Sequence, residues 1–205
     1  MNKPYSQACE NNKDAILTKL IEHFSDLTNV IEIGTGTAQH ATFFAQHLPQ
    51  LTWQTTDLAI NHQGINAWLN EANLSNLKAP IILDLNVPWP TFKQTFDGLF
   101  TANTLHIIAW PLVLKFFAGI ADTIAKHGVV CLYGPFNYNG KYTSASNAEF
   151  DLWLKERDPL SGIRDIEAIE ELAINAGLTL QTDYAMPANN RLLVFRKSLA
   201  TKVGK

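Results

Sequence analysis

A tight turn between a strand and a helix is the first place in this sequence where chemistry is expected. Its residues are Val30-Ile31-Glu32-Ile33-Gly34-Thr35-Gly36-Thr37-Ala38. Gly34 and Gly36 tolerate positive φ angles and let the main chain, including Thr35 between them, approach a ligand closely. The helix that follows offers free N–H groups at its start. The alternative interpretation is a sharp turn that binds nothing.

Carboxylates are expected at the ends of the first three strands. Glu32 lies two residues before the turn, and Asp57 follows at the offset where an acid accepts both hydroxyls of a ribose. Asp84 and Leu85 follow the third strand, where an adenine ring would bind. Ligands of open α/β sheets bind at the carboxyl ends of the strands, so this pattern predicts a nucleoside cofactor. Structural roles as caps and turn residues are the alternative.

Gln39 argues against a dinucleotide. The fingerprint G-x-G-x-x-G requires a small residue where this chain has Gln39. A carboxylate inside a strand, as at Glu32, is costly unless a cation accompanies it, and a cationic methionine moiety would supply one. An NAD(P)-dependent reductase is therefore kept only as an alternative.

Short β-rich runs alternate with helical patterns and must position these residues. Strands are expected at 29–33, 51–56, 79–83, 96–100, 128–133, 178–185 and 191–196. Helices are expected at 12–25, 37–47, 60–73, 107–127, 149–156 and 165–176. Connections of this length favour parallel strands with helices on both faces, and the last two strands are expected to pair antiparallel. The pattern predicts a doubly wound α/β sheet.

Composition favours one domain, 1–205, with an N-terminal helical segment at 1–28 and a long loop insertion at 137–163. The 205 residues are 46% apolar and 17% charged, with a formal charge of −3. No basic run suits nucleic acid, and no apolar run suits a membrane or a signal peptide, so a cytoplasmic protein is expected. Cys9 and Cys131 lack metal-ligand spacing, so no metal is expected.

At Glu32–Gly36 and Asp57 the sequence resembles the class I methyltransferases, which use S-adenosylmethionine (SAM). This resemblance implies a Rossmann-like, mostly parallel seven-stranded sheet whose last hairpin is reversed. It also implies that Glu32, Gly34, Thr35, Gly36, Asp57, Asp84, Leu85 and Asn103 contact the cofactor. Ala38 departs from the family by replacing a third glycine.

More narrowly, the chain resembles the group called methyltransferase-like 26, or domain of unknown function 938. Asn11 stands where that group is expected to have an arginine. The resemblance implies a fold and a cofactor but brings no known substrate. The matching stretches are Ala8–Lys13, Glu32–His40, Trp53–Asp57, Ala102–His106, Tyr133–Phe136, Arg157–Pro159, Gly162–Asp165 and Met186–Asn190.

Catalytic candidates follow the fourth and fifth strands. Asn103 and His106 would face the methyl group, His106 is placed for a general base, and Tyr133 could line an acceptor pocket. A helix cap or a packing residue is the alternative role for His106. The segment lacks the Pro-Pro-aromatic sequence typical of nucleic-acid adenine and protein glutamine methyltransferases, so a small-molecule acceptor is favoured.

Charged and amide side chains around the long loop are candidates for substrate binding: Asn147, Arg157, Arg164 and Asn189. The arginines would suit a carboxylate or phosphate, or they could pin the loop through ion pairs. The leading hypothesis is a SAM-dependent methyltransferase, monomeric or homodimeric, and the alternative is a non-catalytic cofactor-binding partner subunit.

Overall fold

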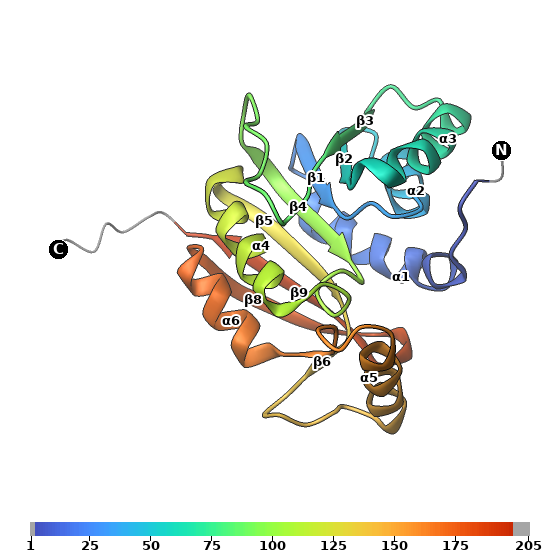
Figure 1. The fold of residues 1–205 in the computed structure, drawn as a ribbon. Coiled ribbons are helices and arrows are strands. Elements are labelled where there is room, and N and C mark those ends of the chain that lie inside the picture. Colours follow the sequence, from blue (N-terminus) through green and yellow to red (C-terminus); the bar gives the residue numbers. More distant parts are fainter. Residues whose placement is uncertain (1–2, 199–205) are drawn as a thin grey trace.

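A computed structural model describes residues 3–198, which form a seven-stranded sheet with helices on both faces (Figure 1). The strands are β1 (Asn29–Ile33), β2 (Thr52–Asp57), β3 (Leu77–Ile82), β4 (Phe96–Ala102), β5 (Ile124–Gly134), β8 (Leu178–Met186) and β9 (Asn190–Lys197). The helices are α1 (Gln7–Phe24), α2 (Gln39–His47), α3 (His62–Ala72), α4 (Trp110–Thr123), α5 (Ala145–Arg157) and α6 (Ile166–Asn175). Shorter elements are the 3-10 helices η1 (Ala59–Asn61) and η2 (Pro187–Asn189) and the strands β6 (Phe136–Asn137) and β7 (Arg164–Asp165).

The strand order is β3-β2-β1-β4-β5-β9-β8. Strand β1 pairs in parallel with β2 on one side and with β4 on the other, so the chain reverses its direction across the sheet at β1. Strand β9 is antiparallel to both β5 and β8. The predicted doubly wound sheet with a C-terminal antiparallel hairpin is therefore confirmed, and its topological switch point lies between β1 and β4.

Alternation along the strands divides the core between the two faces. In β1, Ile31 and Ile33 pack with helices α4 and α6, whereas Val30 packs with α1 and α2 on the other face. Glu32 is the residue that alternation places on the face of Val30, and it is buried there beside Trp53. A strand of five residues thus carries three buried apolar residues and one buried acid.

Several element boundaries differ from the predicted ones. Helix α1 begins at Gln7, where the Ser6 side chain accepts a hydrogen bond from the Cys9 N–H. The predicted helix 107–127 is shorter, because β5 already begins at Ile124. The segment 137–163, predicted as a loop insertion, contains the 13-residue helix α5. The predicted domain covers 1–205, of which residues 1–2 and 199–205 lie outside the described residues.

Within residues 3–198, no helix combines the length and the apolar character needed to cross a bilayer.

Candidate active site

The turn between β1 and α2 has the positive φ angles that its glycines predicted. Gly34 and Gly36 have φ angles of +72° and +61°, and Ala38 also adopts a left-handed conformation at φ +68°. The Thr35 N–H donates to the Thr56 carbonyl at 2.9 Å. The turn is thereby fastened to the end of the neighbouring strand β2.

Glu32 supports the turn from within the core. Its Oε2 accepts hydrogen bonds from the Thr35 hydroxyl at 3.2 Å and from the Trp53 indole N–H at 3.1 Å. Burial raises the pKa of Glu32 from its ordinary value to about 8, against the effect of both hydrogen bonds. The side chain therefore carries a proton at neutral pH and contacts the turn through Thr35.

Asp57 links the end of β2 to the glycine turn. Its Oδ2 accepts from the Gly36 N–H at 2.6 Å, and its Oδ1 accepts from the Leu58 N–H and the Asn61 side-chain amide, each at 2.7 Å. A carboxylate offers about four acceptor positions, so three of them are filled by the protein. Asp57 both fixes Gly36 and keeps capacity for one further donor.

Asp84 and Leu85 follow β3 next to Asp57. The Leu83 N–H donates to the Asp57 carbonyl at 3.0 Å, which brings the end of β3 to the end of β2. The Asp84 carboxylate accepts from the backbone N–H and the side-chain amide of Asn86, and these bonds lower its pKa. Leu85 is buried. The structure therefore brings the acids of the first three strands to one edge of the sheet.

A cavity of about 890 Å³ opens at the ends of β4 and β5, and of the predicted cofactor residues only Asn103 lines it. It contains the three predicted catalytic residues and three of the four predicted substrate-binding residues, which are Asn103, His106, Tyr133, Asn147, Arg157 and Asn189. The first residues of α1 form another wall, together with α5 and η2. Segments far apart in the sequence thus meet around one space.

Asn103 and His106 form the floor of the cavity at the end of β4. Asn103 adopts φ +55°, and its N–H donates to the Tyr133 carbonyl at 2.9 Å, which ties β4 to β5. The His106 ring lies edge-on to Phe150 with centroids 5.5 Å apart. Burial and the Arg164 charge lower the pKa of His106 to about 4, so its imidazole is neutral at physiological pH. Neither side chain makes a hydrogen bond within the described part of the chain.

Helix α5 forms the opposite wall. Asn147 is buried, and its side-chain amide donates to the Asn189 carbonyl at 3.2 Å, while Asn189 donates to the Ser146 hydroxyl. The Arg157 guanidinium stacks over the Trp153 ring at 4.6 Å. The helix is anchored by Asp151, a residue that the sequence did not single out.

The anchor at Asp151 joins three parts of this region. Its carboxylate accepts from the Ile163 N–H at 2.6 Å, the Tyr142 hydroxyl at 2.7 Å and the Lys155 ammonium at 2.6 Å. Asp151 is only 1% exposed, although it is a charged residue on a surface helix. A carboxylate buried with three donors holds α5 against the segment that leads to β7.

Arg164, the fourth predicted substrate residue, lies outside the cavity lining. Its Nε donates to the Leu105 carbonyl at 3.0 Å, and its Nη2 donates to the carbonyls of Ile108 at 2.6 Å and Leu160 at 3.0 Å. These are main-chain acceptors, whereas the alternative drawn from the sequence was an ion pair. The geometry favours the structural role, because the guanidinium donors join the loop after β4 to the segment after α5.

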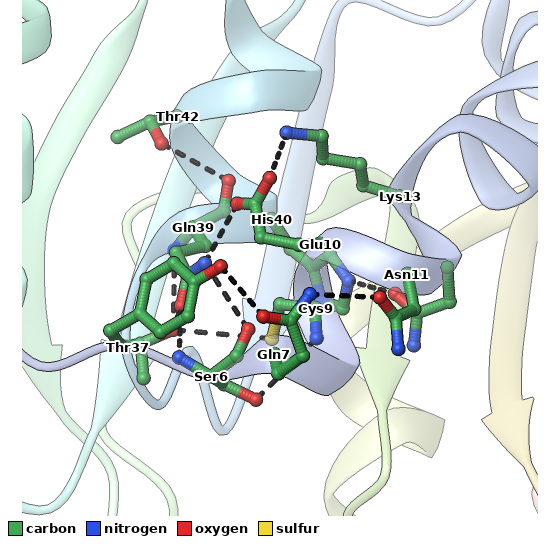
Figure 2. A network of polar contacts seen from close by, with 12 residues as sticks. Ser6, Gln7, Cys9, Glu10, Asn11, Lys13, Thr37, Gln39, His40 and Thr42 are labelled. Atoms are coloured by element: carbon green, nitrogen blue, oxygen red, sulfur yellow. Dashed lines mark hydrogen bonds and ion pairs between the residues drawn. The ribbon is translucent and has the colours of Figure 1, made fainter.

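Figure 2 shows a polar network that joins the start of α1 to the start of α2. The Gln39 side chain accepts from the Ser6 N–H at 2.6 Å and donates to the Glu10 carboxylate at 2.8 Å. Beside it, His40 Nε2 lies 2.7 Å from Asn12 Oδ1. Asn12 was not predicted as a site residue. The available signal was a polar residue on the buried apolar face of α1, one helical turn before Ile16.

A second cavity, about 780 Å³ in volume, lies between residues 86–95 and helix α4. None of the predicted cofactor, catalytic or substrate residues lines it. The convergence of predicted residues therefore singles out the larger cavity at the strand ends.

One family model covers nearly all of the described residues. The model of the family described as "Protein of unknown function (DUF938)" matches residues 3–197. The chain belongs to the DUF938 family. Its kinship within the domain of unknown function 938 was predicted from the matching stretches, and this part of the resemblance is confirmed.

Solved structures similar to this DUF938 protein are methyltransferases. An O-methyltransferase family protein from Burkholderia thailandensis has a TM-score of 0.80 at 16% identity, over 91% of this chain and 56% of that one. An O-methyltransferase family 2 protein from Planctomyces limnophilus, solved with apigenin, has a TM-score of 0.80 at 14% identity, over 93% and 57%. An O-methyltransferase from neocarzinostatin biosynthesis, solved with SAM and 2-hydroxy-5-methyl naphthoic acid, has a TM-score of 0.76 at 16% identity, over 94% and 55%.

These likenesses establish the fold. The DUF938 chain has the Rossmann-like α/β fold of SAM-dependent methyltransferases, with the same mostly parallel sheet. It spans a little over half the length of each of these three proteins.

Proposed function

We propose that this DUF938 protein is a SAM-dependent methyltransferase that acts on a small molecule bearing a hydroxyl group. The observation that carries the proposal is the junction at the switch point of the sheet. There the glycine turn held by Asp57 follows β1, and the neighbouring strand β4 ends at a cavity lined by His106, a buried neutral imidazole. Solved methyltransferases of the same fold, one of them bound to SAM and a hydroxy acid, support it.

The residues at the sheet edge suit an adenosyl cofactor. Asp57 has acceptor capacity left for a ribose hydroxyl, and the buried Leu85 lies in the segment after β3, the strand that pairs with β2. A Cβ added to Gly36 would meet only the Gly34 carbonyl at 4.0 Å, so the space above this residue is open. Glu32 acts beneath the turn by holding Thr35.

Bound at the sheet edge, SAM would supply a sulfonium methyl group for an acceptor oxygen, with the thioether as leaving group, and the proton of that oxygen would have to be removed. His106 is the group assigned to that proton, because it lines the cavity and its ring is unprotonated at neutral pH. Asn103 orients the acceptor with its free side-chain amide, and the walls of the cavity exclude water.

A nicotinamide-dependent reductase is the weaker alternative. A dinucleotide pyrophosphate needs free backbone N–H groups at the start of the helix after the glycine turn. Here the Gln39 side chain, bonded to Ser6 and Glu10, covers the start of α2. This arrangement favours SAM over NAD(P).

A non-catalytic partner subunit is the other alternative. It is favoured by apolar side chains exposed beside the cavity, among them Ile107 at 54%, Leu152 at 63% and Leu160 at 61%. A monomer or homodimer, a cytoplasmic location, the absence of a nucleic-acid partner and kinship with methyltransferase-like 26 stay predictions of the sequence.

The first experiment is thermal unfolding with SAM, S-adenosylhomocysteine, NAD and NADP, on the wild type and on Asp57→Ala. A ligand that binds only the folded state raises its stability. We expect the first two compounds to raise the melting temperature of the wild type and not of the variant. Stabilisation by a nicotinamide cofactor alone, or by none of the four, would refute the proposal. Labelled-methyl transfer to a panel of small hydroxyl compounds then tests catalysis and separates an enzyme from a partner subunit.

A further inference from the structure

Asn147 is a buried amide in the first turn of α5, and the mechanism above gives it no role. It is 5% exposed and lines the cavity of about 890 Å³. Its main-chain N–H donates to the hydroxyl of Ser144, the residue that caps the helix, at 3.1 Å. The backbone of Asn147 is therefore fixed, and the partners of its side chain determine what it presents to the cavity.

Two acceptors determine the orientation of the Asn147 amide. Its Nδ2 donates to the Thr143 hydroxyl at 2.9 Å and to the Asn189 carbonyl at 3.2 Å. A main-chain carbonyl can only accept, so the group that faces it must be the amide nitrogen. Both hydrogens of this nitrogen are therefore used, and within residues 3–198 no donor reaches the Asn147 Oδ1.

The Oδ1 of Asn147 borders open space. Among the described residues, two buried polar side-chain atoms lack both a hydrogen-bond partner and access to solvent, and these are Trp89 Nε1 and Asn137 Oδ1. Asn147 Oδ1 also lacks a partner, so it must remain accessible, and the open space that Asn147 lines is the cavity. A ligand that displaces water from this oxygen must bring a hydrogen for it, because an acceptor left unpaired after desolvation weakens binding.

Helix α5 places this oxygen relative to His106. Phe150 lies one helical turn after Asn147 on the same face of α5, and its ring lies edge-on to the His106 ring with centroids 5.5 Å apart. Three residues of helix span about 4.5 Å. A molecule whose hydroxyl reaches His106 therefore passes along Phe150 before it meets Asn147. A second donor across a ring from the reacting hydroxyl fits this spacing better than one on the adjacent atom.

The cavity walls indicate the kind of molecule that carries the second donor. Among the described lining residues, Arg157 and Asp158 carry the charges, and these are opposite, so the lining selects no net charge. Phe150 and Trp153 stack with centroids 5.7 Å apart and give the α5 wall an aromatic surface. A neutral hydroxyl on an aromatic ring suits these walls better than an ammonium group.

We propose that Asn147 Oδ1 determines specificity and that the substrate is a neutral aromatic diol. One hydroxyl faces His106 and is methylated, while the other donates its hydrogen to Asn147. This assignment rests on the proposed function and narrows its substrate class. It also means that the reaction stops at the monomethyl ether, because a product that entered in reverse would set its ether oxygen against the Asn147 oxygen.

The test uses benzene and naphthalene diols, each paired with its monomethyl ether. Titration calorimetry, with and without S-adenosylhomocysteine, measures the dissociation constant of each compound. We expect the diols to bind about tenfold or more tightly than their ethers, because the ether removes the hydrogen that Asn147 needs. Diols with hydroxyls across the ring should show a larger ratio than those with adjacent hydroxyls. Equal affinities within the pairs, or no binding of any diol, would overturn the proposal.

Three variants assign the preference to the Asn147 oxygen. Asn147→Ala removes the oxygen and should make the affinities for diol and ether nearly equal. Asn147→Asp keeps an acceptor oxygen and should retain the preference for the diol. Thr143→Val is the matched control, since it removes one partner of the amide nitrogen and leaves the Oδ1 and the contact with Asn189.

The control variant should therefore discriminate as the wild type does. Discrimination that persists in Asn147→Ala, or that disappears in Thr143→Val as well, would contradict the assignment. Methyl transfer from labelled SAM, measured on the same pairs, tests the proposed function separately. A preference for diols in binding, without methyl transfer to any of them, would refute the proposed function and leave Asn147 as the specificity residue of a binding site.

Discussion

The edge of the sheet at β1–β3 and the cavity at β4–β5 are built in different ways. The edge consists of Glu32–Gly36 and Asp57, and its hydrogen bonds join neighbouring strands directly. The cavity is assembled from α1, α5, η2 and the ends of two strands. The edge follows from a short motif at the end of a strand, whereas the cavity depends on the packing of distant segments.

The two regions also differ in how their polar groups are used. At the edge, the carboxyl groups of Glu32 and Asp57 are already engaged by protein donors. In the cavity, the Asn103 amide and the His106 ring make no side-chain hydrogen bond within residues 3–198. We infer that the edge is preorganised for a fixed cofactor and that the cavity supplies the groups that meet a variable acceptor.

The largest expected effect is a loss of methyl transfer without a loss of cofactor binding. His106→Gln should reduce methyl transfer about 100-fold or more, because the acceptor loses its general base. The rise in melting temperature caused by S-adenosylhomocysteine should stay unchanged, since His106 lies in the cavity. Labelled-methyl transfer and thermal unfolding measure the two properties. A parallel loss of both would mean that His106 supports the fold.

Glu32→Gln tests the proton held at the edge. The folded-state pKa of Glu32 is raised to about 8, so the folded protein holds a proton that the unfolded chain loses above its ordinary value of 4.5. Wild-type stability should therefore fall as pH rises between these values, by up to about 1.4 kcal/mol per pH unit, and level off above them.

The glutamine variant should lack this fall. Urea unfolding of both proteins across the same pH range gives the difference in the free energy of unfolding, from which the histidine contributions cancel. The pKa values of His40 and His106 are lowered, so each adds stability that is lost as pH falls from about 6.5 toward 4, in both proteins alike. Parallel pH profiles would show that Glu32 is ionised in the folded state.

Gly34→Ala tests the turn itself, with Gly140→Ala as control. Both glycines have positive φ, at +72° and +68°, so each substitution should cost about 1 kcal/mol of folding free energy. At Gly34 the new methyl would also lie 3.0 Å from the Thr104 hydroxyl, which is held by Thr101 at 2.7 Å, whereas Gly140 has nothing within 4 Å.

We therefore expect Gly34→Ala to cost roughly 1 kcal/mol more than the control and to abolish stabilisation by SAM. Urea unfolding and thermal shift measure the two effects. Equal losses of folding free energy in the two variants, with stabilisation by SAM retained, would mean that the turn does not contribute to cofactor binding.

The smallest effect is expected at Arg157, one of the two arginines near the cavity. Arg164→Ala should lower the free energy of unfolding by roughly 1–3 kcal/mol, because three carbonyls lose their donor. Arg157→Ala should cost under about 1 kcal/mol, since it removes one exposed stacking contact. Urea unfolding of both variants checks the order. A larger loss for Arg157 would contradict the assignment of Arg164 as the structural arginine.

Local signals in the sequence were sufficient for much of the sheet. Strand 29–33 was predicted with the bounds that β1 has, because a short apolar run before a glycine turn has few other solutions. Helix α5 was predicted too short and within a loop, since its anchor Asp151 bonds to partners on either side of the helix. Periodicity cannot report such contacts.

The sequence by itself determined the glycine turn and the acids at the strand ends, because φ angles and strand termini are constraints within a few residues. Only the tertiary structure decided which polar groups share the cavity and in what state. Asn12 meets His40 across 28 positions, and burial between helices and sheet keeps His40 and His106 neutral. Desolvation and hydrogen-bond direction depend on neighbours that packing alone brings together.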